Sequence, residues 1–198
     1  MPSLPVVRPS FSFIVAASAV LFASGALAEP VKSEPAARFI DSIGANVHPC
    51  ENYERHHDVL KKKLGELGVR HVRDGTTPKS FRLAMSFYKA HGIKTTFITG
   101  RRVGGEKEWS SPLRPEGIID ELNELCGQAL AATAAIEGPN EYDLHSDKRD
   151  PDWPATLQNY QRLVFTHANE DPAPRPLPVI GPSLTSEEAY RKVGDLDA

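Results

Sequence analysis

Short apolar runs alternate with helical stripes of apolar residues from residue 39 onward. The runs resemble half-buried or buried strands, whereas the stripes recur every three or four residues, as on one face of a helix. Glycine and proline often separate the two kinds of segment. The pattern predicts strands at residues 39–47, 69–73, 93–99, 132–137 and 177–181, and helices at residues 53–67, 78–91, 116–130, 154–168 and 186–192.

The joints between these segments carry matching end signals. Gly68 and Gly92 each follow a predicted helix and lead directly into the next strand, as a left-handed C-terminal cap would. Thr77 and Pro78 open the second helix as its N-cap and first helical residue. Repeated strand–helix units of this kind predict a parallel sheet and an α/β fold.

Two architectures fit such units: an open doubly wound sheet and a closed (β/α)8 TIM barrel. No glycine-rich phosphate loop follows the first strand, where residues 46–50 read NVHPC, so a nucleotide-binding open sheet lacks its main signature. We therefore expect a TIM barrel. Because 198 residues are fewer than the about 250 of a complete barrel, we expect a barrel truncated to about its first five β/α units.

The composition narrows the class of ligand. The chain has a formal net charge of −3, with 25% charged residues. This balance gives no electrostatic reason to expect a nucleic acid or an anionic membrane surface as partner. A small neutral ligand fits better. No metal-ligand spacing is present, and we expect neither a metal nor another cofactor.

The N-terminal segment differs from the rest of the chain. Arg8 provides a short positive region, residues 11–23 form an apolar stretch, and the tripeptide ALA at residues 26–28 matches a cleavage site. A membrane anchor is the alternative, but the stretch is rich in Ala and Ser and short for a span of about 20 residues. We expect a signal peptide at 1–28, a leader at 29–38, and a secreted or periplasmic mature chain.

Polar side chains follow the predicted strands at their carboxyl ends. In a β/α barrel these ends meet at one edge, which carries the active site. After the fourth strand, Gly138 and Pro139 end the apolar run and direct Asn140 and Glu141 to this edge. The polar residues that follow the five strands in order are His48, Arg73, Asp74, Thr99, Arg101, Asn140, Glu141 and Ser183.

The sequences IEGPNE at residues 136–141 and VRHVRDG at residues 69–75 resemble the clan of retaining β/α-barrel glycoside hydrolases. The similarity extends loosely over residues 39–185 and looks most like the xylosidase/iduronidase-like and cellulase-like branches. The resemblance implies that residues 39–198 are the N-terminal part of a glycoside hydrolase-like domain. It implies an exported enzyme that hydrolyses O-glycosidic bonds in oligo- or polysaccharides, with a carbohydrate as its substrate.

The resemblance also implies roles for particular residues. Retaining hydrolysis needs two carboxyl groups about 5 to 5.5 Å apart, one a nucleophile and one that donates and later removes a proton. In the resembling enzymes this acid/base is the Glu of the Asn-Glu pair, here Glu141, whereas Asn140 would bind the sugar 2-hydroxyl and Arg73 would orient the nucleophile. Tyr142 and His48 are further candidates for sugar contact, although His48 could be only a hydrogen-bonded residue of the barrel mouth.

The same residues allow a purely structural interpretation. Asn140 and Glu141 could begin a surface loop, since Gly-Pro-Asn favours a turn. Arg73 could be an ion-pair partner of Asp74 or Glu137. Glu137 precedes the turn, and we expect it to point into the barrel and to support Arg73 or another basic group.

The nucleophile of the resembling enzymes is a Glu at the end of strand seven. This chain ends at Ala198, shortly after the fifth predicted strand, so we expect an incomplete chain without that strand. Three hypotheses stay open: the N-terminal part of an exported glycoside hydrolase, a non-catalytic carbohydrate-binding half-barrel, and a different barrel enzyme that merely shares Asn-Glu. Continuation of the coding sequence into a strand that ends in Glu would separate the first from the second.

Overall fold

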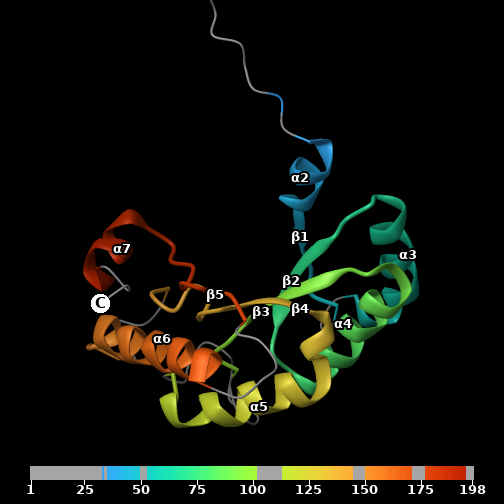
Figure 1. The fold of residues 1–198 in the computed structure, drawn as a ribbon. Helices are drawn as coiled ribbons and strands as arrows, with labels where there is room; N and C mark the ends of the chain where they lie inside the picture. Colours follow the sequence, from blue (N-terminus) through green and yellow to red (C-terminus); the bar gives the residue numbers. More distant parts are fainter. Residues whose placement is uncertain are drawn as a thin grey trace, which may run out of the picture. The chain divides into compact units, whose positions relative to one another are not determined.

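A parallel sheet of five strands follows the order of the chain, β1-β2-β3-β4-β5 (Figure 1). Each strand pairs with the next: Asn46 lies opposite Arg73 between β1 and β2, and Ile98 lies opposite Glu137 between β3 and β4. The strands are β1 (Gly44–Asn46), β2 (His71–Gly75), β3 (Lys94–Ile98), β4 (Thr133–Glu137) and β5 (Val179–Ile180).

The computed structural model describes residue 33 and residues 35–49, 53–101, 113–144, 150–170 and 177–194. The chain divides into Met1–Pro35 and Ala36–Ala198, and all of the described helices and strands lie in the second unit. The signal peptide expected at 1–28 lies outside the described residues. Within the described ranges, no helix is both long enough and apolar enough to cross a membrane.

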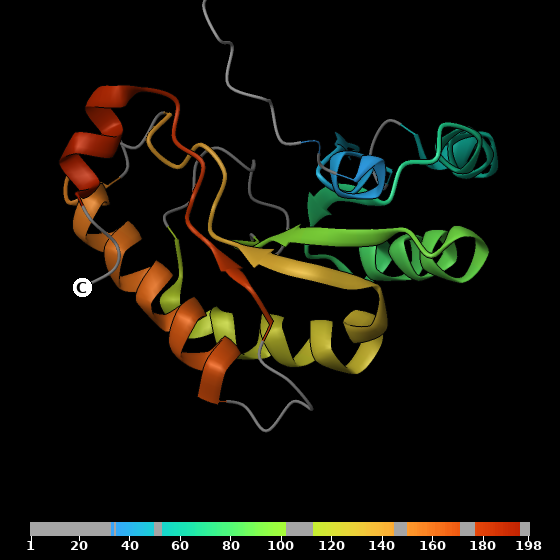
Figure 2. The same cartoon turned by 45° about the horizontal axis from the view of Figure 1, so that its top comes forward.

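Helices connect the strands and lie along one face of the sheet (Figures 1 and 2). Helices α3 to α6 contact one another in turn. Parallel strands that are adjacent in sequence and in space produce this arrangement, because each right-handed crossover returns on the same side. The helices are α2 (Ala36–Asp41), α3 (His57–Glu66), α4 (Pro78–His91), α5 (Ile118–Ala129), α6 (Trp153–Glu170) and α7 (Glu187–Val193), with 3-10 turns η1 (Glu54–His56), η2 (Pro115–Gly117) and η3 (Leu130–Ala132).

Alternate strand residues point toward these helices and form the core. Phe97 on β3 and Ile136 on β4 are buried together with Phe81 on α4 and Leu125 on α5. The rings of Phe81 and Phe97 meet edge to face with their centroids 5.3 Å apart. A smaller apolar cluster includes Leu64 on α3. Burial of each such side chain contributes about 1.5 to 3 kcal/mol to folding, so the core fixes the helices on this face.

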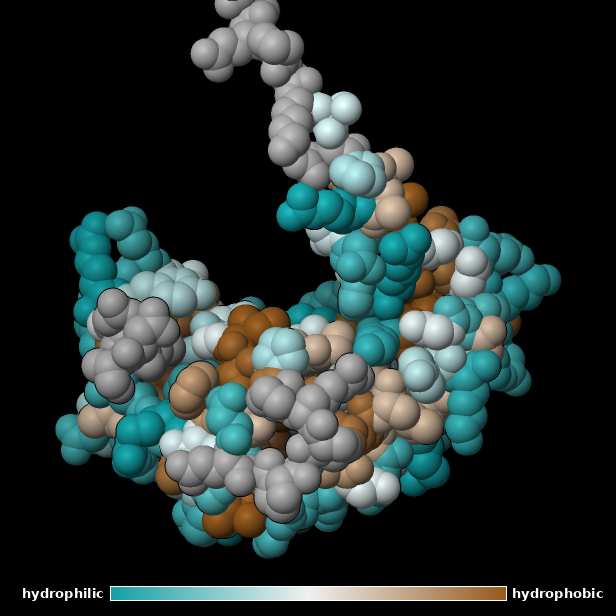
Figure 3. All heavy atoms as spheres, viewed as in Figure 1, coloured by the Kyte–Doolittle hydropathy of each residue, from teal (hydrophilic) through white to brown (hydrophobic). Residues whose placement is uncertain are grey.

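The remaining strand residues lie on the opposite face, which helices α3 to α6 leave uncovered and which we call the open face. Arg73 and Glu137 lie on it. In the space-filling view the surface is hollowed between α7 and the segment with α2 and β1 (Figure 3). Among the described strands, β1 and β5 each pair on one side only. Their outer edges therefore present backbone groups with no strand partner in the described part of the chain.

The predicted α/β order and the parallel pairing are confirmed. The helix predicted at 78–91 is α4, and Thr77 caps it by accepting a hydrogen bond from the backbone N–H of Ser80 at 3.0 Å. Gly68 and Gly92 have φ angles of +68° and +69°, so both are the left-handed caps that the sequence predicts.

Two details of the prediction are wrong. Residues 39–41 belong to helix α2 and not to the first strand. The pairing of β1 with β2 begins where Gly44 meets His71, so the residues before Gly44 have no strand beside them. The helix predicted at 53–67 ends one residue early, since α3 ends at Glu66, and Leu67, where the chain turns, is 75% exposed.

Gly138 allows the end of β4 to approach β5 closely. Its N–H donates to the carbonyl of Ile180 at 3.0 Å, and a Cβ at this position would meet Oε1 of Gln161 and lie 3.0 Å from the backbone N of Pro182. Because neither the strand end nor Pro182 can move away freely, we expect Gly138→Ala to lower the free energy of unfolding by about 1 to 3 kcal/mol in urea denaturation.

Gly127 provides the matched control. It lies on α5, and a Cβ there would meet nothing within 4 Å. Gly127→Ala should raise the free energy of unfolding by about 0.5 to 1 kcal/mol, because alanine loses less conformational entropy than glycine when it joins a helix. Equal losses in the two variants would contradict the close approach at Gly138.

Candidate functional site

Arg73 and Glu137 form an ion pair on the open face. Arg73 Nε donates to Glu137 Oε2 and Arg73 Nη2 donates to Glu137 Oε1, both at 2.6 Å. The side chain of Glu137 is 6% exposed and that of Arg73 is 24% exposed. Since β3 lies between β2 and β4, the pair bridges the middle strand. Two parallel hydrogen bonds fix the orientation of both groups as well as their distance.

Asn140 and Ser183 complete the hydrogen bonds around this pair. Arg73 Nη2 donates to Asn140 Oδ1 at 2.8 Å and lies 3.4 Å from Ser183 Oγ, which donates to Glu137 Oε1 at 2.8 Å. A guanidinium group can only donate hydrogen bonds. The amide oxygen of Asn140 therefore faces Arg73, and its NH2 group points away from the ion pair and stays a donor for another group.

The surrounding charges stabilise the protonated form of Arg73. Its pKa lies above the ordinary arginine value, chiefly because of the hydrogen bond to Glu137, and the negative charges of Glu137 and Glu141 also raise the pKa, against the effect of burial. Glu141 is therefore near enough for its charge to act on Arg73. The site combines one cation with two carboxyl groups, and Arg73 donates to both oxygens of Glu137 while Ser183 donates to Oε1 alone.

Glu141 has a backbone conformation that residues other than glycine rarely adopt. Its φ is +50°, and no other non-glycine residue in the described ranges has a positive φ. Its N–H donates to the carbonyl of Ser183 at 2.7 Å, and its carbonyl accepts from the N–H of Leu144 at 3.0 Å. Such conformations cost about 1 to 3 kcal/mol and cluster at active sites and ligand clamps.

Two Gly-Pro steps set the positions of these residues. Residues 138–140 read GPN after β4, and residues 181–183 read GPS after β5. Proline cannot donate to a sheet ladder, so each strand ends there, and Asn140 and Ser183 then form a parallel bridge beyond the strands. The sequence pattern predicts Ser183 at this edge but assigns it no role. The repeated Gly-Pro step is the signal that could have paired it with Asn140.

His48 lies at the same edge but apart from these contacts. The residue before it, Val47, donates its N–H to the carbonyl of Arg73 at 3.1 Å, which fixes the end of β1 beside β2. The side chain of His48 is exposed and makes no hydrogen bond to any described residue. The expected sugar contact of His48 stays a prediction.

Tyr142 lies in the core, where sugar stacking does not fit. Its ring is 1% exposed. The hydroxyl donates to Asp150 Oδ2 at 2.9 Å and accepts from the N–H of Leu113 at 3.2 Å. A ring that stacks on a sugar needs an open face, so the substrate-binding role expected for Tyr142 is corrected to a packing role: Tyr142 attaches the segment after β4 to the core.

The site can thus offer a carboxyl group at Glu141 and hydrogen-bond donors at Asn140. Among the described residues, no group of three or more His, Cys, Asp or Glu side chains is arranged to hold a metal ion. Comparisons with protein-family models, with curated proteins and with solved structures gave no match.

The backbone of Glu141 gives a test that needs no ligand. Glycine takes a φ of +50° without the steric cost that a Cβ imposes, so we expect Glu141→Gly to raise the free energy of unfolding by about 1 kcal/mol. Urea denaturation of the purified variant measures this change. If Glu141 lowers stability relative to glycine, its presence is better explained by a function of its side chain than by a role in folding.

Glu116→Gly is the control, because Glu116 is an exposed residue of η2 whose φ is not positive. There the added chain entropy should lower stability by about 0.5 to 1 kcal/mol. A loss of stability at both positions would mean that the Glu141 backbone carries no strain.

Proposed function

We propose that this chain is the N-terminal part of an exported retaining glycoside hydrolase, in which the five strands are the first five units of a (β/α)8 barrel. The sequential strand order supports the barrel, because a doubly wound sheet reverses its strand order and carries helices on both faces. A closed barrel would also pair the outer edges of β1 and β5 with further strands.

Glu141 is the proposed general acid/base. It lies at the carboxyl edge of the sheet, as barrel active-site residues do, and its charge acts on Arg73. The strained backbone at Glu141 is the observation that carries this assignment. Since the hydrogen bonds to Ser183 and Leu144 hold the peptide in a conformation that disfavours a side chain, retention of a carboxyl group there favours a chemical role.

Asn140 is the proposed donor to a sugar hydroxyl. Its amide oxygen is occupied by Arg73, so the NH2 group is the part that a ligand can engage. Hydrogen bonds to the sugar 2-hydroxyl strengthen in the transition state of glycoside hydrolysis. Arg73 then has two functions: it orients Asn140, and it holds the paired carboxylate of Glu137 within electrostatic range of Glu141.

The nucleophile is proposed to be a carboxylate from a further strand, as the resemblance implies. Glu137 is the nearest alternative among the described residues, but it is unsuitable. Both of its oxygens accept hydrogen bonds from Arg73, one of them also from Ser183, and its side chain is buried. A carboxylate engaged in this way is a poor nucleophile because attack would break the ion pair.

Oligosaccharide titration followed by NMR tests the proposal on the chain as it exists. We expect neutral xylo- or cello-oligosaccharides to shift the Asn140 side-chain NH2 signals, with a dissociation constant of about 1 mM, typical of a site with few contacts. Asn140→Ala should weaken binding about tenfold through the lost hydrogen bond. Asn123→Ala, at an exposed position of α5, should leave binding unchanged.

Two results would contradict the proposal. If neither pentose- nor hexose-based oligosaccharides shifted the signals of Asn140 or Glu141, the site would not be a carbohydrate site. If the 198-residue chain hydrolysed aryl glycosides at a rate that Glu141→Gln abolished, the nucleophile would lie within this chain.

A further inference from the structure

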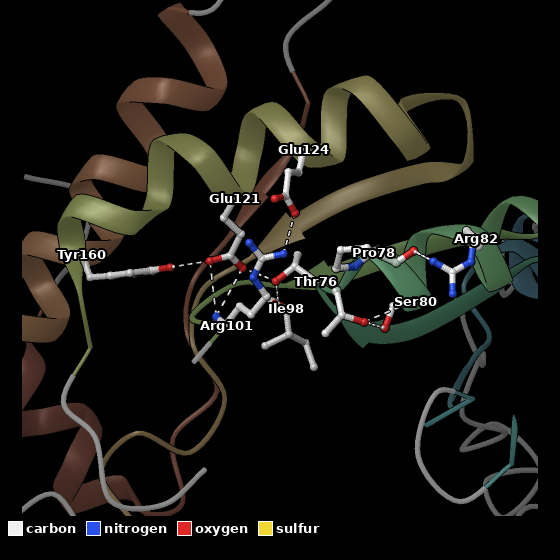
Figure 4. A network of polar contacts seen from close by, with 10 residues as sticks. Thr76, Pro78, Ser80, Arg82, Ile98, Arg101, Glu121, Glu124 and Tyr160 are labelled. Carbon is white, nitrogen blue, oxygen red and sulfur yellow. Dashed lines mark hydrogen bonds and ion pairs between the residues drawn. The ribbon is translucent and has the colours of Figure 1, made fainter. Parts of the chain in front are cut away.

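The carboxyl group of Glu121 is buried on the helix side of the sheet, opposite the open face. Glu121, in the first turn of α5, is 3% exposed. Figure 4 shows that the hydroxyls of Thr76 and Tyr160 and the backbone N–H of Arg101 converge on its carboxylate. The Thr76 hydroxyl donates to Oε1, the Arg101 N–H lies 3.4 Å and 3.3 Å from the two oxygens, and the Tyr160 hydroxyl is 3.4 Å from Oε2.

These partners come from different elements. Thr76 follows β2, Arg101 follows β3, and Tyr160 belongs to α6. Thr76 Oγ1 also lies 3.2 Å from the carbonyl of Ile98, the last residue of β3. One carboxylate on α5 therefore joins the carboxyl ends of β2 and β3 to the helix layer.

The contacts continue to β4 and from there to the open face. Thr99 lies two residues before Arg101, whose N–H contacts Glu121, and the Thr99 side chain acts on the pKa of the Tyr160 hydroxyl. Thr99 donates to the carbonyl of Glu137 through both its N–H, at 2.8 Å, and its hydroxyl, at 2.9 Å. The side chain of that same Glu137 binds Arg73. A continuous series of polar contacts thus runs from Glu121 through the sheet to the ion pair.

Glu121 differs from an ordinary surface carboxylate in its electrostatics. Burial raises its pKa above the usual glutamate value, while the hydrogen bonds from Thr76 and Arg101 and the charge of Arg101 oppose this rise. The Arg101 guanidinium itself donates to Glu124 at 2.6 Å and also interacts with the charge of Asp120. Among the residues that the structure describes, these contacts place four titratable groups around Glu121: Arg101 after β3, Asp120 and Glu124 on α5, and Tyr160 on α6.

We propose that Glu121 is a positioning residue that fixes the carboxyl ends of β2, β3 and β4 and thereby sets the geometry of the Arg73–Glu137 pair. The relevance of this positioning to hydrolysis depends on the proposed function, whereas the positioning itself does not. Ionisation of Glu121 adds a charge that burial disfavours and that the hydrogen bonds from Thr76 and Arg101 stabilise, so these contacts at the ends of β2 and β3 change with its protonation state. The ion pair on the open face therefore responds to the titration of a group on the opposite side of the sheet.

NMR of the Arg73 Nε–H signal and hydrogen exchange at the Thr99 amide test this inference. In the wild-type protein, the Arg73 signal should shift with pH in a step that lies above the ordinary range of carboxyl groups. Glu121→Gln keeps the side-chain shape but cannot ionise, so the step should disappear. The Thr99 amide should exchange about tenfold faster in this variant, because local opening near β4 becomes easier.

The linkage between titration and stability gives a second readout. Because the folded-state pKa of Glu121 is raised, its contribution to stability is full below the unfolded-state pKa and is lost as pH rises through the folded-state pKa. The unfolding free energy of the wild type relative to Glu121→Gln should therefore increase as pH falls through that window.

Glu124→Gln is the matched control. It removes another carboxylate of α5, the one that pairs with the Arg101 guanidinium, but leaves Glu121 in place. It should retain the pH step and the slow exchange at Thr99. Tyr160→Phe tests the same series of contacts if Glu121→Gln does not fold, because it removes only a hydroxyl. It should diminish the pH step of the Arg73 signal.

The positioning role would be overturned if the pH step of the Arg73 signal persisted in Glu121→Gln or kept its full size in Tyr160→Phe. It would also be overturned if the Thr99 amide exchanged at the wild-type rate in Glu121→Gln. None of these readouts requires a sugar. A failure here therefore leaves the oligosaccharide titration unaffected, and the absence of sugar binding leaves the coupling between Glu121 and Arg73 intact.

Discussion

The ion pair between Arg73 and Glu137 determines the arrangement of the open face. A guanidinium group and a carboxylate removed from water are costly unless each is paired and hydrogen-bonded. Here the two bonds of 2.6 Å require β2 and β4 to keep their positions on either side of β3. Asn140 and Ser183 then bind to the same two groups, so the segments beyond β4 and β5 depend on the pair as well.

The two faces of the sheet are stabilised by different interactions. On the helix side, apolar burial between the strands and α3 to α6 provides most of the stability, and Glu121 is a buried carboxyl exception. On the open face, polar contacts set the geometry, and the backbone at Glu141 carries strain. Thr99 and Glu137 connect the two sides, because their backbone contacts lie within the sheet while the Glu137 side chain reaches the open face.

The sequence was sufficient for the features that local patterns encode. Hydrophobic periodicity and end signals such as Thr77, Gly68 and Gly92 indicated the helices and strands, since these signals act within a few residues. The pairing of Arg73 with Glu137, one of two alternatives left open by the sequence, is confirmed. It could be anticipated because both residues lie near strand ends of one parallel sheet and carry opposite charge.

Other features depend on the tertiary structure and were missed. Tyr142 follows Glu141, but the left-handed turn at Glu141 precedes a ring that is buried in the core, and a periodic pattern does not encode such a turn. Glu121 looks like an ordinary acidic residue in the first turn of a helix, a position that favours negative charge. Only the folded chain shows that Thr76, 45 residues earlier, and Tyr160 converge on it.

A double-mutant cycle in urea denaturation tests the central role of the ion pair most directly. Glu137→Leu should lower the free energy of unfolding by about 3 kcal/mol, because it leaves Arg73 without its counter-charge. Arg73→Met alone should cost about as much, because it leaves Glu137 buried without its counter-charge, and the double variant should cost no more than either single variant, so the coupling energy between the two residues is about 3 kcal/mol. Additive effects of the two substitutions, with a coupling energy below about 0.5 kcal/mol, would contradict the account.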